Sequence, residues 1–128
     1  MSFGIWEGLS MGHEELIVER SGSVARLSIN RPKRLNALRM TVTDRAILDA
    51  LKECEQDDEI KVIILTGVGE KAFCTGWDFE EIDESSLADL ENLIRLNLEL
   101  FFGVWNSKLP IIAAINGYAI GTGSALAL

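Results

Sequence analysis

The sequence predicts an α/β domain in which helices cover a sheet. Paired alternating runs at 14–29 predict a hairpin, and continuous apolar runs at 61–67 and 111–115 are typical of buried strands. Two longer segments, near 40–56 and 87–105, repeat apolar residues every three or four positions, as amphipathic helices do. Strands and helices that alternate in this way indicate an α/β architecture. The 128 residues, 48% hydrophobic and 25% charged, suit one globular domain.

The hairpin is predicted from residues 14–20 and 24–29, which Ser21, Gly22 and Ser23 join with good turn chemistry. A loop follows at 30–38, because Pro32 cannot donate a hydrogen bond within a central strand.

Two helices are expected next. The first runs from about Met40 to Gln56, and its apolar face carries Ala46, Ile47, Ala50, Leu51 and Cys54. The second, at 87–105, has two apolar stripes, so we expect it to be buried against more than one neighbour, within the domain or across subunits. One stripe consists of Leu87, Leu90, Ile94, Leu98, Phe101 and Trp105, and the other of Leu93, Leu96, Leu100 and Val104.

The remaining segments are predicted to be loops, one buried strand and the start of a helix. Residues 68–82 are rich in loop signals, with a helical turn at 78–82, and Pro110 precedes the strand at 111–115. A helix is expected to begin near Gly123. Because this apolar helix has no C-cap signal at Leu128, we expect the domain, residues 12–128, to be incomplete, with 1–11 as an N-terminal extension.

Charge and cysteine usage narrow the function classes. The net charge of −8 argues against nucleic acid and anionic membranes as partners. Cys54 and Cys74 form no CxxC pair and have no metal-ligand companions, so we expect reduced thiols and no metal site. His13 lies in a polar N-terminal stretch.

No signal peptide or membrane span is predicted, which favours the cytoplasm, with the mitochondrial matrix not excluded.

Two glycine-containing loops follow the buried strands, and such loops meet at one edge of a parallel sheet. The loop INGYAIGTGS at 115–124 leads into a helix, whose first N–H groups are unpaired and can stabilise an oxyanion. The segment after 61–67 reads GVGEKAFCTGWDFEEI and is a poor match to a dinucleotide-binding GxGxxG.

Three motifs resemble those of the crotonase-like (enoyl-CoA hydratase/isomerase) superfamily. They are AFCTGWD at 72–78, INGYAIGTGS at 115–124 and NRPKRLNAL at 30–38, and the likeness covers nearly the whole chain in the same order. The resemblance implies a crotonase/ClpP-like spiral of repeated β-β-α units, truncated after the second oxyanion-hole loop, so that the chain is the N-terminal half of the domain. It also implies assembly as homotrimers or hexamers.

The resemblance further implies an acyl-CoA thioester as ligand, with coenzyme A as part of the substrate and no separate cofactor. The oxyanion hole would consist of the backbone N–H groups of Trp77 and Thr122. Lys33 or Arg34 could meet a CoA phosphate or be solvated surface charge, and Asp78 could instead cap the turn that follows it, which we favour. The residues expected to border the substrate and CoA are Lys33, Leu35, Ala37, Thr75, Asp78, Phe79 and Gly121.

The reaction is less defined, because Ala125 stands where hydratases of this family carry a catalytic glutamate. Proton transfer of the isomerase type is the first choice and hydration the second. The alternatives are thioester hydrolysis or dehalogenation, a non-catalytic acyl-CoA-binding homologue, and a nucleotide-binding α/β domain. We interpret Cys74 as a packing residue, and the acids Glu80, Glu81, Asp83 and Glu84 as a solvated face.

Overall fold

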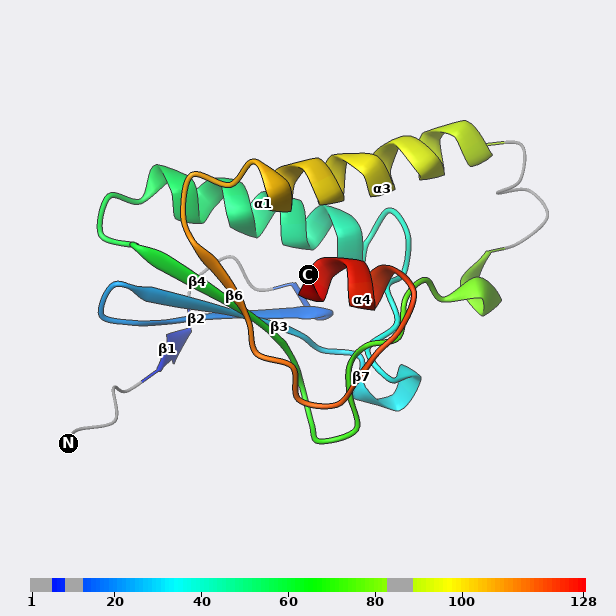
Figure 1. Ribbon diagram of the computed structural model, residues 1–128, viewed down its shortest axis with the longest axis horizontal. Helices are drawn as coiled ribbons and strands as arrows, with labels where there is room; N and C mark the ends of the chain where they lie inside the picture. Colours follow the sequence, from blue (N-terminus) through cyan, green and yellow to red (C-terminus); the bar gives the residue numbers. More distant parts are fainter. Residues whose placement is uncertain (1–5, 9–12, 83–88) are drawn as a thin grey trace.

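The computed structural model describes residues 6–8, 13–82 and 89–128. Its main sheet has five strands in the order β1-β2-β3-β4-β6 (Figure 1). β2 and β3 are the antiparallel hairpin that the sequence predicts, and β3, β4 and β6 are parallel, so both candidate loops lie beyond the carboxyl ends of neighbouring strands. The strands are β1 Glu7–Gly8, β2 Leu16–Ser21, β3 Val24–Ile29, β4 Val62–Gly67 and β6 Ile111–Ala113.

A second sheet of two parallel strands, β5 Ala72–Cys74 and β7 Tyr118–Ala119, joins the two candidate loops. The interpretation of both segments as loops alone was wrong. Strands of three and two residues are too short to show an alternating pattern, and they form because each finds the other in the folded chain. Residues 7 and 8 of the predicted N-terminal extension likewise pair with β2 as an edge strand.

The helices form two layers on one face of the main sheet, with α1 against the sheet and α3 outside α1 (Figure 1). α1 begins three residues later than predicted, and Leu87 lies outside the described residues. The helical segments are α1 Thr43–Gln56, α3 Leu90–Trp105, α4 Thr122–Ala127, and the 3-10 turns η1 Pro32–Arg34 and η2 Phe79–Glu81.

The core lies between the sheet and α1. Leu27, Ile29 and Ile63 of the sheet pack with Ile47 and Leu51 of α1, and all five are almost completely buried. Removing such apolar surface from water stabilises the fold by about 25 cal/mol per Å².

Only one stripe of α3 is buried in the described chain. Leu93, Leu96 and Leu100 are buried on the side toward α1, but Ile94 and Leu98 are 45% and 48% exposed. Within the described part of this chain the outer stripe is therefore uncovered, and its burial across subunits stays a prediction. In that part, no helix combines the length and apolar character needed to cross a bilayer.

The strand order confirms repeated β-β-α units. β4 and β5 precede α3, and β6 and β7 precede α4. In these two units the first strand joins the main sheet and the second joins the small one, whereas β2 and β3, which precede α1, both lie in the main sheet. The repetition places the segments after β5 and β7 side by side, and these segments carry the predicted site residues.

Candidate functional site

The two candidate loops touch at a pair of glycines, Gly76 and Gly121. A β-carbon added at Gly76 would lie 3.1 Å from the Ile120 carbonyl oxygen and 3.5 Å from the Thr122 nitrogen. Gly76 and Gly121 have φ angles of +93° and +57°, which L-residues with side chains rarely adopt. Both positions therefore favour glycine for their backbone conformation, and at Gly76 the close approach of the other loop also leaves little room for a side chain.

The backbone N–H groups of Trp77 and Thr122 lie beside this contact. The peptides around Trp77 are fixed by hydrogen bonds with Leu38, from Leu38 N to Gly76 O (2.7 Å) and from Asp78 N to Leu38 O (2.9 Å). Thr122 begins α4, where helical N–H groups have no partner within the helix. Neither N–H donates a hydrogen bond to any part of the chain that the structure describes.

The end of β5 supports the start of α4. The Ile120 N–H donates to the Cys74 carbonyl at 3.0 Å, and a β-carbon at Gly123 would collide with that same carbonyl. The position of Thr122 therefore depends directly on the position of β5.

Both cysteines are buried thiols. Burial is the main cause that raises the pKa of Cys74 to about 11, and burial likewise raises the pKa of Cys54 to about 11. At neutral pH these groups are protonated and poorly nucleophilic, so Cys74 is suited to packing beneath the candidate loop.

Asp78 connects the motif NRPKRLNAL, at 30–38, to the loop that carries Trp77. Arg34 donates two hydrogen bonds to its carboxylate, at 3.1 and 2.8 Å, and Arg31 lies 3.1 Å away. These arginine contacts, Arg34 first, hold the pKa of the buried Asp78 below its usual value. Asp78 also accepts from the Glu80 N–H at 3.3 Å, which confirms the predicted cap of η2. Its carboxylate is thus occupied within the protein.

A pocket of about 470 Å³ lies beside the motif NRPKRLNAL. Lys33, Leu35 and Lys71 all line it. Lys71 was missed in the sequence, since only the folded loop places it on the same pocket as Lys33. Ala37 is buried, and its carbonyl accepts from Arg31 at 2.6 Å. The pocket is lined by Pro32, Lys33, Leu35, Asn36, Val68, Gly69, Glu70, Lys71 and Ala72.

Thr75 links this pocket to the glycine contact, because its hydroxyl donates to the Leu35 carbonyl at 3.1 Å. Gly121 is exposed on the other side of the contact. Phe79 is 72% exposed. Its ring packs edge to face against the Trp77 ring, with 6.4 Å between the ring centroids. The predicted site residues therefore lie around the two loops and the pocket beside them. Ala37 and Asp78 lie there too, but neighbouring residues cover them.

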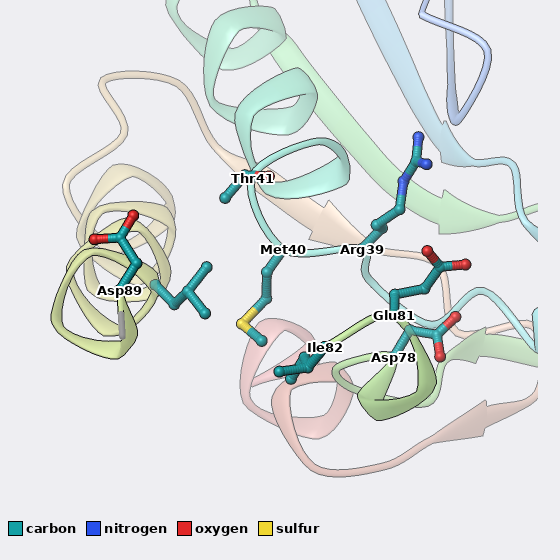
Figure 2. Close-up of a pocket in the computed structure, with 8 residues that line it drawn as sticks. Arg39, Met40, Thr41, Asp78, Glu81, Ile82 and Asp89 are labelled. Atoms are coloured by element: carbon teal, nitrogen blue, oxygen red, sulfur yellow. The ribbon is translucent and has the colours of Figure 1, made fainter. Parts of the chain in front are cut away.

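A second pocket, of about 320 Å³, is lined by Asp78, the residue that follows Trp77 in the chain (Figure 2). Figure 2 shows the Met40 side chain pointing toward Ile82, while Arg39 points the opposite way. Leu93 of α3 adds to the apolar wall. No sequence pattern predicted this pocket, because its walls come from three separate segments. It is lined by Arg39, Met40, Thr41, Asp78, Glu81, Ile82, Asp89 and Leu93.

Glu80 and Glu81 are exposed, as the sequence predicts for a solvated face. Ala125 is exposed on α4 and lines an apolar pocket with Phe101 and Trp105. Glu80 is exposed and bonded to Arg34 at 2.7 Å, whereas Asp83 and Glu84 lie outside the described residues. Asp44, which the sequence did not single out, is completely buried at the start of α1, and burial raises its pKa to about 6.

Known proteins match most of this chain. Residues 19–128 match the family model described as enoyl-CoA hydratase/isomerase. The chain is 38% identical over 113 residues to the short-chain-enoyl-CoA hydratase of Clostridium acetobutylicum, covering 88% of this chain and 43% of that protein. It is 36% identical over 118 residues to the human mitochondrial 3-hydroxyisobutyryl-CoA hydrolase, covering 90% and 30%.

Solved structures show the same likeness. The crystal structure of an enoyl-CoA hydratase/carnithine racemase from Magnetospirillum magneticum superposes with a TM-score of 0.84 at 32% identity, covering 94% of this chain and 46% of that one. This chain therefore spans less than half the length of each of these three proteins.

Proposed function

The chain belongs to the enoyl-CoA hydratase/isomerase family, and from this premise we propose that the protein binds an acyl-CoA thioester and stabilises its enolate through the N–H groups of Trp77 and Thr122. The observation that carries the proposal is the Gly76–Gly121 contact, which brings the Thr122 nitrogen to the edge of the loop that holds Trp77. Residues 12–128 would supply the N-terminal half of the family's domain.

The proposed chemistry needs donors that favour negative charge. When a proton leaves the α-carbon of a thioester, charge develops on the carbonyl oxygen, and two fixed N–H groups stabilise that oxyanion more than the neutral carbonyl. Because the donors belong to the backbone, the side chains of Trp77 and Thr122 can vary without removing them.

The two pockets suggest how the rest of the substrate would lie. Lys33 and Lys71 offer positive charge to the CoA phosphates, and Thr75 and Leu35 lie between that pocket and the proposed oxyanion hole. The acyl chain would enter the second pocket along its apolar side, which Met40, Ile82 and Leu93 form; the rest of the lining is polar (Figure 2). The bulk of Trp77 would then restrict the shape of the acyl chain.

Proton transfer of the isomerase type remains the first proposal for the reaction, because Ala125 offers no acid for a hydratase that uses two carboxylates. Hydration is the second. The match to a CoA-thioester hydrolase keeps hydrolysis as an alternative, together with dehalogenation and non-catalytic binding. The family match favours a CoA thioester over a dinucleotide.

A proline at position 122 tests the proposed oxyanion hole. Thr122 is the first residue of α4, a helix position that accepts proline, so Thr122→Pro removes one N–H; circular dichroism checks that the variant is folded. We expect α-proton exchange of bound butyryl-CoA in D2O, followed by mass spectrometry, to slow by about a hundredfold or more. Thr122→Ala is the matched control, since it keeps the N–H and should retain the rate. An unchanged rate in Thr122→Pro would refute the assignment.

Ligand protection tests the choice of CoA. A ligand that binds only the folded protein raises its melting temperature. We expect butyryl-CoA at 1 mM to raise the melting temperature of the whole protein by several degrees, and NAD at the same concentration to raise it much less. Equal protection by the two ligands would favour a nucleotide-binding domain instead.

A further inference from the structure

Two asparagines from different motifs hold the same carbonyl oxygen. Asn36 belongs to NRPKRLNAL and Asn116 to INGYAIGTGS, and neither has a part in the proposed chemistry. Their side-chain amides donate to the Ala72 carbonyl at 2.8 Å and 3.1 Å. Ala72 is the first residue of β5, the strand that leads to the loop of Trp77.

The side-chain amide nitrogen and oxygen of Asn36 both form hydrogen bonds with nearby backbone groups. Besides Ala72, its amide nitrogen donates to the Val68 carbonyl at 3.0 Å, and its oxygen accepts from the Arg31 N–H at 2.9 Å. The side chain is 1% exposed, and the residue itself has a φ of +54°. A buried amide in a strained backbone persists only where the surrounding structure requires it.

Asn116 repeats the arrangement from the other side. Its amide nitrogen donates to the Gly69 carbonyl at 2.8 Å as well as to Ala72, and its oxygen accepts from the Gly67 N–H at 3.1 Å. The two asparagines therefore hold both ends of the 67–72 turn between β4 and β5.

Two glycines allow the asparagines to approach. A β-carbon at Gly67 would lie 2.5 Å from the Ala72 oxygen and 2.6 Å from the Asn36 amide nitrogen. A β-carbon at Gly117, next to Asn116, would collide with the Lys71 carbonyl. Glycine at positions 67 and 117 therefore leaves room for the two amides beside the Ala72 carbonyl.

From Ala72 the contacts continue to both proposed donors. β5 pairs with β7 through Ala72 and Tyr118, and two residues later the Cys74 carbonyl accepts from the Ile120 N–H. Gly76 then meets Gly121, beside Thr122. A displacement of β5 would therefore move the Trp77 and Thr122 N–H groups relative to each other.

We propose that Asn36 and Asn116 are positioning residues that hold β5 through the Ala72 carbonyl and so set the distance between the Trp77 and Thr122 N–H groups. This inference rests on the proposed oxyanion hole. It gives the motif NRPKRLNAL, through Asn36, a role in positioning β5. Because the asparagines share one acceptor, loss of either loosens the turn that the other holds, and their effects are coupled.

The experiment measures the polarisation of a bound carbonyl. Butyryl-CoA labelled with 13C at the thioester carbonyl is bound to the whole protein, and the isotope-edited infrared band reports the strength of its hydrogen bonds. In the wild type we expect the band to move to lower frequency on binding. In Asn116→Ala and in Asn36→Ser we expect at least half of that shift to be lost, while the Kd changes less than about threefold and α-proton exchange slows about tenfold to a hundredfold.

The matched control is Asn30→Ala. The Asn30 amide donates to a backbone carbonyl at 3.0 Å, that of Glu14, and makes no side-chain hydrogen bond to the 67–72 turn, although the preceding residue, Ile29, accepts from the Val68 N–H at 2.9 Å. We expect this variant to keep the wild-type shift and exchange rate. Circular dichroism sets a temperature at which each variant is folded; Asn116→Ser replaces Asn116→Ala if the latter does not fold.

The possible outcomes separate the two claims. An infrared shift that is absent in the wild type contradicts the oxyanion hole itself. A wild-type shift that both asparagine variants retain contradicts the positioning role alone. In the variant that lacks both asparagines, an exchange loss smaller than the product of the single losses supports the shared acceptor, whereas a loss equal to the product contradicts it.

Discussion

Asp44 and Asp78 are both buried carboxyl groups, and their surroundings move their pKa values in opposite directions. Arg34 and Arg31 surround Asp78 and lower its pKa. Asp44 forms no ion pair or hydrogen bond of normal geometry among the described residues, and burial raises its pKa to about 6, although the nearby Asn97 amide acts in the opposite sense. Asp44 therefore destabilises the fold when it is charged, whereas Asp78 stabilises it.

Asp44 gives a stability prediction that depends on pH. Its folded pKa of about 6 exceeds the unfolded value of about 3.9, so it has no effect below pH 4 and its full destabilising effect above pH 6. The difference between the folded and unfolded pKa values corresponds to about 3 kcal/mol of destabilisation. Asp44→Asn removes the charge at constant shape, and we expect its unfolding free energy to exceed that of the wild type by a margin that grows by about 1.5 kcal/mol between pH 5 and pH 8.

Urea unfolding at pH 5, 6.5 and 8 measures that margin. Asp49→Asn, at an exposed position on the same helix, is the control and should show no such growth. A margin that stays constant with pH would mean that the Asp44 pKa is ordinary.

At the scale of elements, the seating of α4 on β5 determines the geometry of the candidate site. Gly123 lies in the first turn of α4, against the Cys74 carbonyl, and the space there excludes a side chain. Helix propensity alone would favour alanine over glycine by about 1 kcal/mol. Packing and propensity thus make opposite predictions for this position.

We expect packing to dominate in Gly123→Ala. The added methyl group must push α4 away from β5, so the free energy of unfolding should fall by about 1 to 3 kcal/mol and α-proton exchange should slow. Gly8→Ala is the control, because nothing lies within 4 Å of the added methyl group. A Gly123→Ala variant more stable than the wild type would show that α4 is not seated on Cys74.

The sequence predicts the long elements better than the short ones. The hairpin, α1 and α3 were predicted because each has enough residues to show its period, and β4 and β6 because each lies in a continuous apolar run. β5 and β7 were missed because they depend on each other across more than forty residues. Trp77 and Thr122 could be located from motif resemblance, but the asparagine contacts with Ala72 and the pairing of Lys33 with Lys71 follow only from the folded loops.

At the scale of the whole molecule, the outer face of α3 remains apolar and exposed. Leu90, Ile94 and Leu98 repeat every four residues along it, and Trp105 is 87% exposed. Exposed apolar surface of this extent marks an interaction site in soluble proteins. We propose that this stripe is buried in a homotrimer or hexamer of the whole protein.

A charge on the stripe tests the assembly. We expect the wild type to sediment as a trimer or hexamer and Leu98→Glu to sediment as a monomer, because burial of an unpaired carboxylate costs several kcal/mol. Arg95→Glu changes an exposed polar position of the same helix and should leave the assembly unchanged. Sedimentation velocity distinguishes these results, and a monomeric wild type would contradict the proposal.

The central claim is that one carbonyl oxygen lies between the N–H groups of Trp77 and Thr122. The most direct test is a crystal structure of the whole protein with a butyryl-CoA analogue in which a methylene group replaces the thioester sulfur. We predict the ketone oxygen within hydrogen-bond distance of both nitrogens, with the CoA phosphates near Lys33 and Lys71. A ketone oxygen bonded elsewhere, with both N–H groups free, would contradict the account.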